Sequence, residues 1–265
     1  MSDVRLLPLL AVALVVLVAA PSAASPARAS ARTMRLMTYN LNFGNPDHTA
    51  TLDAIAAGDA DIVLLQEVTA DWRHQLEERF AAQYPHQKYR IHARAAGGLA
   101  VLSKHPIRSE EVWSPPRGGW FPASRVIVEA PFGPLQLLNV HLRPCLDGGS
   151  WIKGWHTTPP IRKREIEAYW KRIQYDIPTI VAGDFNEPAD GKAIAYLSKH
   201  GMTRVATSGP TTWHYETWMQ GERKSVLALD IDHVMIDGHF TASDAHVLDA
   251  GSSDHRPVVV TLTRR

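Results

Sequence analysis

The sequence predicts one α/β domain in which short buried strands alternate with helices. Apolar runs recur along the chain and stop at Gly, Pro or polar residues, which is typical of strands covered on both faces. Segments with helical spacing of apolar residues separate several of these runs. No repeat, low-complexity tract or linker interrupts residues 34–265, a length that can bury one large core.

Polar or helix-breaking residues end the elements expected in the first half of the domain. The first two strands stay largely apolar until they reach Asn40 and Glu67, and Pro85 ends the second helix. The expected order is a strand at 35–42, a helix at 49–57, a strand at 61–67, a helix at 71–84 and a strand at 98–103.

The second half is expected to begin with two strands that pair around residues 131–134. Residues 143–160 are expected to form a loop, because Gly and Pro interrupt them repeatedly. Pro160 suits the first turn of a helix, and Gly201 suits the end of another. The expected order is strands at 125–130 and 135–142, a helix from 160 through 173, a strand at 180–184, a helix at 190–200, and strands at 229–236 and 258–263.

The segment Ile180–Pro188 carries the first chemical signal. Its apolar run stops at Gly183, so Asp184 and Asn186 lie where a strand ends, and their spacing of two places both side chains on one face of an extended segment. A carboxylate that takes a proton and an amide that orients water are half of a hydrolytic site. The alternative is an Asx turn that closes the strand, since Gly, Asp and Asn are common turn residues.

Other strands also end in, or carry near an end, a polar residue capable of catalysis. Spread along the chain, these residues suggest one site gathered at one edge of the sheets. The residues are Asn40, Glu67, His141, Asp184 with Asn186, Asp232, and the pair Asp254-His255 in the turn before the last strand.

The order of these motifs resembles the endonuclease/exonuclease/phosphatase superfamily. The Gly-Asp-Phe-Asn and Ser-Asp-His-x-Pro segments together are specific, whereas the others are weak singly. The matching segments span essentially the whole domain and are Met37–Asn40, Leu65–Glu67, Gly98–Ser103, Asn139–Leu142, Gly183–Asn186, Asp232–Met235 and Ser253–Pro257.

The resemblance implies a four-layer α/β/β/α sandwich, in which two packed mixed β-sheets are flanked by helices. It also implies a metal-dependent phosphoesterase site at one edge. Glu67 would ligate Mg²⁺ or Mn²⁺, with Asn40 beside it and Asp254 contributing, and an oxygen-rich ligand set suits Mg²⁺.

The resemblance gives the remaining motif residues catalytic roles. Asp184 and Asn186 would position the attacking water, while Asp232 would fix the tautomer of His255 and favour its imidazolium form. Two assignments of the general base stay open. Asp184 is one; in the other, the His255–Asp232 pair is the base and His141 is the acid for the leaving group.

Three residues are expected to contact the substrate phosphate: Arg125, His141 and Asn186. The sequence departs here from the pattern of pancreatic-type DNases, in which a glutamate on an earlier strand pairs with the counterpart of His141. Residues 88–92 are the plausible place for that glutamate, and they offer no acid. A role for His141 as phosphate hydrogen-bond donor does not need that glutamate.

The N-terminus predicts export. Residues 1–25 combine a charged start, an apolar centre and small residues, as in a cleaved signal peptide, with an uncleaved anchor as the alternative. Residues 26–33 are expected to be a flexible mature N-terminus, and residues 34–265 the endonuclease/exonuclease/phosphatase domain. The mature protein would be secreted or periplasmic. Its single cysteine, Cys145, allows no internal disulfide.

The sequence leaves the substrate class open. A formal net charge of +1 excludes a strong non-specific hold on nucleic acid or anionic membrane, but residues 143–172 carry seven basic side chains against three acidic ones, interleaved with Trp151 and Trp155. Such a mixture suits a nucleic-acid backbone or a phospholipid surface, and a solvated helix face with packing tryptophans is equally compatible.

We therefore expect a divalent-metal-dependent phosphoester hydrolase, an exported phosphodiesterase similar to endonucleases. The alternatives are a sphingomyelinase-like phospholipid phosphodiesterase, a phosphatase of inositol phosphates or other small phosphoesters, and an inactive binding protein on the same fold. The expected partners are a phosphoester substrate in nucleic acid or a phospholipid headgroup and, for the latter, a membrane surface. No obligate protein partner is implied.

Overall fold

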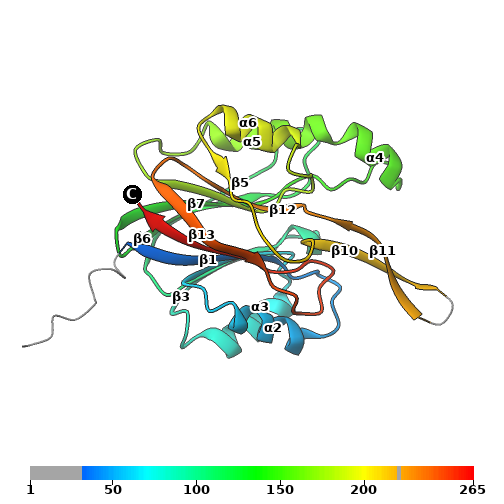
Figure 1. The fold of residues 1–265 in the computed structure, drawn as a ribbon, viewed down its shortest axis with the longest axis horizontal. Coiled ribbons are helices and arrows are strands. Elements are labelled where there is room, and N and C mark those ends of the chain that lie inside the picture. The colour runs from blue at the N-terminus through cyan, green and yellow to red at the C-terminus, as the bar shows by residue number, and fades with distance from the viewer. Residues whose placement is uncertain (1–31, 220–221) are drawn as a thin grey trace, which may run out of the picture.

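Two six-stranded mixed sheets pack face to face between helical layers in a computed structural model, which describes residues 32–219 and 222–265 (Figure 1). The four-layer α/β/β/α sandwich expected from the sequence is thereby confirmed. Sheet A has the order β13 (Phe240–Val247), β14 (Val258–Arg264), β1 (Thr33–Asn40), β2 (Ile62–Gln66), β4 (Leu99–Ser103), β3 (His86–Arg90). Sheet B has the order β5 (Ile107–Trp113), β6 (Ala123–Ala130), β7 (Gly133–His141), β8 (Thr179–Asp184), β12 (Asp232–Ile236), β9 (Thr203–Arg204).

The helices cover the outer faces of the two sheets. Helices α2 (His48–Ala57) and α3 (Ala70–Phe80) lie on sheet A, below it in Figure 1, and α5 (Pro159–Trp170) and α6 (Lys192–Lys199) lie on sheet B. Helix α4 (Trp151–Thr157) precedes α5. Local signals explain their starts: the Thr69 side chain caps α3, and proline occupies the first positions of α5.

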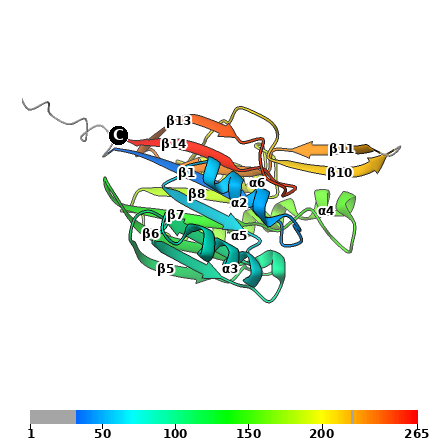
Figure 2. The same ribbon diagram turned by 90° about the horizontal axis from the view of Figure 1, so that it is seen from below.

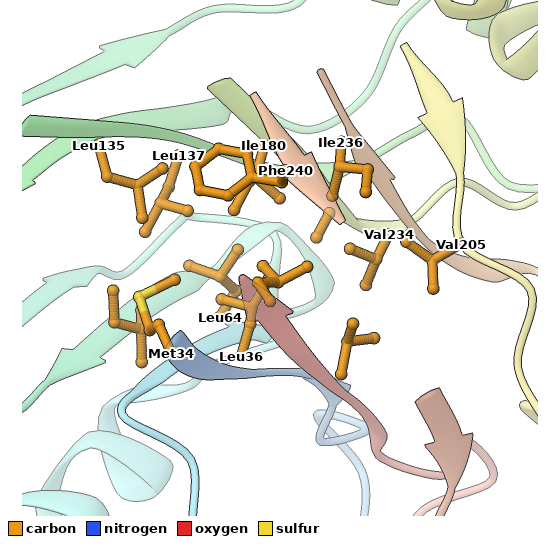
Figure 3. Close-up of a cluster of buried hydrophobic side chains, with 14 of the residues drawn as sticks. Met34, Leu36, Leu64, Leu135, Leu137, Ile180, Val205, Val234, Ile236 and Phe240 are labelled. Atoms are coloured by element: carbon orange, nitrogen blue, oxygen red, sulfur yellow. The ribbon is translucent and has the colours of Figure 1, made fainter. Parts of the chain in front are cut away.

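Aliphatic side chains fill the space between the sheets. Figure 3 shows Met34, Leu36 and Leu64 of sheet A facing Leu137 and Ile180 of sheet B, and all five are fully buried. Separate apolar clusters lie between each sheet and its helices. Burial on both faces explains why the central strands appear in the sequence as continuous apolar runs.

Two parallel strand pairs determine where the ends of the central strands lie. β1 is parallel to β2 in sheet A, and β7 is parallel to β8 in sheet B. The remaining pairs within both sheets are antiparallel. Since the carboxyl ends of parallel strands meet at one edge, Asn40 and Glu67 are neighbours, as are His141 and Asp184.

The structure corrects several expected elements. Residues 143–160 contain helix α4 rather than loop alone, and the helix expected at 71–84 ends at Phe80. Strands β3, β5, β9 and β13 were not expected, because they are short or carry polar and exposed residues at sheet edges. A further hairpin, β10 (Trp213–Met219) with β11 (Glu222–Leu229), extends beyond the sandwich (Figure 2).

The predicted signal peptide at 1–25 lies outside the described residues, as does most of the segment 26–33. Thr33, at the end of that segment, already belongs to β1. Within the part of the chain that the structure describes, no helix is long and apolar enough to cross a membrane.

Candidate active site

The ends of strands from both sheets meet at one edge of the sandwich. Asn40 ends β1 and Glu67 follows β2 in sheet A, while His141 ends β7 and Asp184 ends β8 in sheet B. Asp232 begins β12 directly opposite Asp184, because these two residues are partners in the antiparallel register. The predicted convergence of side chains that are far apart in the sequence is present in the structure.

Asp184 lies at the centre of this cluster. Its Oδ2 accepts a hydrogen bond from Asn40 Nδ2 at 3.1 Å and lies 3.4 Å from His141 Nε2 and 3.7 Å from His255 Nε2. The side chain is almost fully buried, and burial raises the pKa of Asp184 well above the ordinary range of a carboxyl group, against the opposing effect of His255. A carboxylate with such a pKa is suited to take a proton near neutral pH.

The other oxygen of Asp184 has a structural role. Asn186 donates its backbone N–H to Asp184 Oδ1 at 2.8 Å, which is the Asx turn that the sequence offered as an alternative. Asn186 has a φ of 52°, and its side chain donates to the carbonyl of Leu142 at 3.1 Å. The turn and the site therefore coexist, with one carboxylate oxygen used for each.

Asp232 and His255 form a buried pair. His255 Nδ1 lies 2.8 Å from Asp232 Oδ2, so the ring donates there and turns Nε2 toward Asp184. Burial by itself lowers the pKa of His255, but Asp232 and Asp184 outweigh it and raise that pKa, favouring the imidazolium. The expected hold of Asp232 on His255 agrees with this geometry.

Thr212 holds the backbone at Asp232 in place, a role that the sequence did not predict. Its buried hydroxyl accepts the backbone N–H groups of Ile231 and Asp232 at 3.0 and 3.1 Å. A threonine in a loop carries no local signal for this role, because its partners are about twenty residues away.

Glu67 adopts a conformation that is unusual for a residue with a side chain. Its φ is 60°, in the left-handed region, and such strain is concentrated at functional sites. Glu67 Oε1 accepts from Asn40 Nδ2 at 3.2 Å, and Oε2 accepts from the backbone N–H of Phe43 at 2.9 Å. The carboxylate is held at the site and stays partly open to solvent, 15% exposed.

His141 lacks a carboxylate on the side of the ring away from the cluster. Its Nδ1 lies 2.9 Å from the carbonyl of Ala96, and the Phe121 ring lies over it with centroids 4.4 Å apart. The missing acid noted in residues 88–92 is thus replaced by a backbone carbonyl, which orients the ring. Burial lowers the pKa of His141 by more than the hydrogen bond to this carbonyl raises it.

Asp254 lies beside the cluster, and both of its oxygens accept hydrogen bonds. Asn42 Nδ2 donates to Asp254 Oδ1 at 2.8 Å, and Trp213 Nε1 donates to Oδ2 at 2.9 Å. Each oxygen keeps a second lone pair, so the expected contribution of Asp254 to a metal site stays a prediction. The residue also ties the base of the β10–β11 hairpin to the loop that carries His255.

Arg125 does not join the site, which corrects its expected contact with phosphate. On β6 it is paired with Leu138 of β7, a residue of the cluster between sheet B and the helices, so it points to the outer face. It is buried there, forms an ion pair with Glu111 and approaches the ring of Trp113.

The basic patch expected in residues 143–172 is also smaller than its composition suggests. Arg162 is fully buried and binds Glu187 Oε2 at 3.2 Å and the Arg143 carbonyl at 3.1 Å. Lys163 forms an ion pair with Glu167 one turn away. Arg162 therefore cannot bind a polyanion at the surface, and charge reversal there would disrupt the core.

The donor set of the cluster fits a cation. Asp184, Asp232 and His255 each offer a ligand atom within 4.8 Å of the others, and all three are buried. Asp232 Oδ1 is buried without a hydrogen-bond partner among the described residues. An unpaired buried carboxylate oxygen is costly, and a bound cation would compensate it.

Comparisons with known proteins agree with the fold and the motif order. A family model described as the Endonuclease/Exonuclease/phosphatase family matches residues 37–255. No curated protein matches the chain. A solved endonuclease/exonuclease/phosphatase from Beutenbergia cavernae DSM 12333 has a TM-score of 0.66 at 21% identity, covering 88% of this chain and 72% of its own.

Two further solved structures show the same fold at lower identity. Sphingomyelinase C from Streptomyces griseocarneus has a TM-score of 0.62 at 17% identity and covers 86% of this chain and 99% of its own. A family protein from Leptotrichia buccalis C-1013-b has a TM-score of 0.64 at 15% identity, with the same coverages. At these identities, the likeness establishes the fold.

Proposed function

Because the chain belongs to the Endonuclease/Exonuclease/phosphatase family, we propose that it is a divalent-metal-dependent phosphodiesterase. The observation that carries the proposal is the cluster around Asp184, in which acids, an amide and two histidines from both sheets converge. A phosphodiester is negatively charged and repels hydroxide, so its hydrolysis needs positive charge near phosphorus and a base for the attacking water.

The chain supplies both from its own side chains. Asp184, with its raised pKa, accepts the proton of the water that attacks phosphorus. His255, kept protonated by Asp232, neutralises charge on the phosphoryl oxygens. Of the two general bases left open by the sequence, the proposed mechanism therefore uses Asp184, because an imidazolium cannot accept the proton of the attacking water.

We place the cation, Mg²⁺ or Mn²⁺, at Glu67 with Asn40. The group Asp184, Asp232 and His255 could also hold an ion, but only if His255 releases its Nε2 proton when the ion binds. Glu67 presents hard oxygen atoms at the partly open edge of the site, as Mg²⁺ prefers. A cation bound there would neutralise part of the negative charge on the phosphate oxygens.

A substrate panel tests the proposal. The purified protein should hydrolyse bis(p-nitrophenyl) phosphate with Mg²⁺ or Mn²⁺ and lose this activity in EDTA, and plasmid DNA and sphingomyelin vesicles in the same panel identify the substrate class. Asp184→Ala should abolish whichever activity is present while the protein stays folded. Activity that is insensitive to EDTA, or near-normal turnover by Asp184→Ala, would contradict the mechanism.

A phospholipid headgroup is the second candidate substrate, and one surface of the protein favours it. Trp151, Ile152 and Trp155 on helix α4, here called the α4 surface, are 57%, 81% and 42% exposed. Trp151 stacks on Trp213, whose indole N–H binds Asp254 beside His255. The α4 surface therefore adjoins the site, and exposed tryptophans with Lys153 beside them suit the headgroup region of a bilayer.

The same fold occurs in the sphingomyelinase C from Streptomyces griseocarneus, which supports testing this candidate directly. For this second candidate, hydrolysis of sphingomyelin should exceed that of plasmid DNA, and release of the phosphorylated headgroup should require the divalent cation. Nicking of plasmid DNA without hydrolysis of vesicles would identify nucleic acid as the substrate instead.

A further inference from the structure

A buried polar network joins the two sheets beneath the candidate active site. Asn139 on β7 donates its side-chain amide to the carbonyls of Leu65 and Ala100 at 3.0 and 3.1 Å. Its Oδ1 accepts from Gln66 Nε2 at 2.7 Å, and the same nitrogen of Gln66 lies 3.1 Å from Thr38 Oγ1. The network thus ties β7 of sheet B to β1, β2 and β4 of sheet A.

The orientation of the Asn139 amide follows from its partners. Two carbonyl oxygens can only accept hydrogen bonds, so the NH₂ group of Asn139 must face Leu65 and Ala100, which leaves Oδ1 for Gln66. Asn139 and Gln66 are both fully buried. The amide of Asn139 is paired at both of its ends, whereas Gln66 Oε1 has no hydrogen-bond partner among the described residues. A slip of the sheets would leave further buried groups unpaired, which is costly.

The core on the side of the network away from the site gives no such directional restraint. The side chains there are aliphatic, including Leu64 from sheet A and Leu137 from sheet B (Figure 3). Apolar contacts hold the sheets together but have no preferred direction, and they tolerate small shifts. Directional hydrogen bonds between the described parts of the two sheets are found at the Asn139–Gln66 contact and, within the site itself, at the Asn40–Asp184 contact.

The relative position of the two sheets matters because the site is divided between them. Glu67 directly follows Gln66 in sheet A, and His141 lies two residues after Asn139, on the same face of β7. The contacts that cross between the sheets include Asn40 Nδ2 to Asp184 Oδ2 at 3.1 Å and Glu67 Oε1 to His141 Nε2 at 3.9 Å. A slip of one sheet by about 1 Å would change both distances, and displacement on this scale is costly for catalysis.

We propose that Asn139 and Gln66 are positioning residues: their hydrogen bond holds the sheet that carries Glu67 in register with the sheet that carries Asp184. The divalent cation and the phosphoester then meet preformed partners from both sheets. The inference rests on the proposed function for its catalytic consequence, whereas its structural content, the register of the sheets, is independent of any substrate.

The test replaces both amides by apolar side chains of similar size. The variant Gln66→Met/Asn139→Leu removes both amides together, and with them the unpaired Gln66 Oε1. The carbonyls of Leu65 and Ala100 and the hydroxyl of Thr38 each lose one hydrogen bond, so the protein is expected to fold with lowered stability. Leu137→Ala is the control, since Leu137 is equally buried, lies on the same face of β7 two residues before Asn139, and makes no polar contact. It loosens the same interface without removing the directional bond.

Four measurements are made on both variants: the melting temperature without metal, the Mn²⁺ affinity by calorimetry, a crystal structure, and steady-state kinetics. The double variant should bind Mn²⁺ about 10- to 100-fold more weakly, as expected when groups that orient ligands are removed. Its Asn40–Asp184 separation should depart from 3.1 Å. Leu137→Ala should lower the melting temperature and keep both the affinity and the separation. In kinetics, kcat of the double variant should fall more than KM changes.

The outcomes separate the inference from the function. A double variant with wild-type Mn²⁺ affinity and separation would overturn the inference, as would an equal loss in Leu137→Ala. If the wild-type protein hydrolyses no phosphoester, the proposed function fails, but affinity and separation still decide the role of the network. If the wild-type protein binds no Mn²⁺, the crystallographic separation decides alone. If the double variant does not fold, Asn139→Ser takes its place in the same measurements.

Discussion

Gly183 lies against the carbonyl oxygen of Val140, so close that a Cβ atom at position 183 would come within 2.0 Å of it. The two residues are partners in the parallel pairing of β7 and β8, directly before His141 and Asp184. Gly183 also has a φ of +142°, which side chains other than hydrogen disfavour. The close approach of these strands brings the two site residues together.

Gly183→Ala should therefore damage both stability and site. We expect a loss of at least about 2 kcal/mol in the free energy of unfolding, since strain and collision act together. Urea unfolding measures it. Two alanine controls separate the causes: Gly133 has a positive φ with open space around it, and Gly238 has open space without that φ. If Gly183→Ala cost no more than Gly133→Ala, the collision with Val140 would be unimportant.

Asp232→Asn tests the electrostatic role of the pair with His255. Asp232 raises the pKa of His255 above neutral, so activity that needs the imidazolium should persist above pH 7 and fall as the pH rises through that pKa. Without the charge of Asp232, burial lowers the pKa and the alkaline loss should move to lower pH. At neutral pH we expect kcat/KM to fall about 10²- to 10⁴-fold.

The measurement is the pH dependence of kcat/KM, together with the NMR titration of the His255 ring. Asp254 and Asp184 also favour the charged ring, so part of the shift should remain in the variant. Asp176→Asn, at an exposed position, serves as control. If the alkaline loss of kcat/KM stayed at the same pH in Asp232→Asn, a group other than His255 would control that loss.

The two possible cation positions differ in which substitution should weaken Mn²⁺ binding most. With the cation at Glu67, Glu67→Gln should lower Mn²⁺ affinity by about tenfold or more and reduce the rise in melting temperature that Mn²⁺ produces. Asp232→Asn should reduce the affinity less. The reverse order would place the cation in the group of Asp184, Asp232 and His255. Glu78→Gln, on the exposed side of α3, controls for general charge effects.

The elements that were predictable share one property, burial of a continuous apolar run. β2 and β8 are buried at every position, so their composition shows both the strand and its polar end. β13 and β5 expose several positions at or near sheet edges, and their polar composition matches that of a loop. Helix α4 is short and contains Gly154, so it has no helical period to detect.

Site residues were predictable where the chemistry lies at a strand end, and not where it depends on a distant partner. Arg162 resembles Lys163 and Arg164 in sequence, but only Arg162 meets Glu187, twenty-five positions away, and is buried. Arg125 was misplaced for a different reason. Alternation along β6 places successive side chains on opposite faces of the sheet, but it does not say which face carries the site.

Ile152→Asp tests whether the α4 surface contacts lipid. Ile152 is 81% exposed, so the substitution should leave the stability unchanged. If the side chain enters a bilayer interface, its loss removes about 1.5–3 kcal/mol of apolar burial, which corresponds to about tenfold or more in binding. Binding to sphingomyelin vesicles and hydrolysis of their headgroups should fall by that factor, while turnover of soluble bis(p-nitrophenyl) phosphate stays constant.

Tyr175→Asp is the matched control for this experiment, because it also replaces an exposed apolar side chain by an aspartate. Tyr175 is 68% exposed but lies in the segment before β8, at the end of that strand opposite to Asp184, so it should not affect vesicle binding. Equal losses in both variants would indicate a general effect of surface hydrophobicity. Unchanged vesicle hydrolysis by Ile152→Asp would show that the α4 surface does not contact lipid. A side chain as exposed as Ile152 would enter the bilayer interface if the α4 surface lay on it.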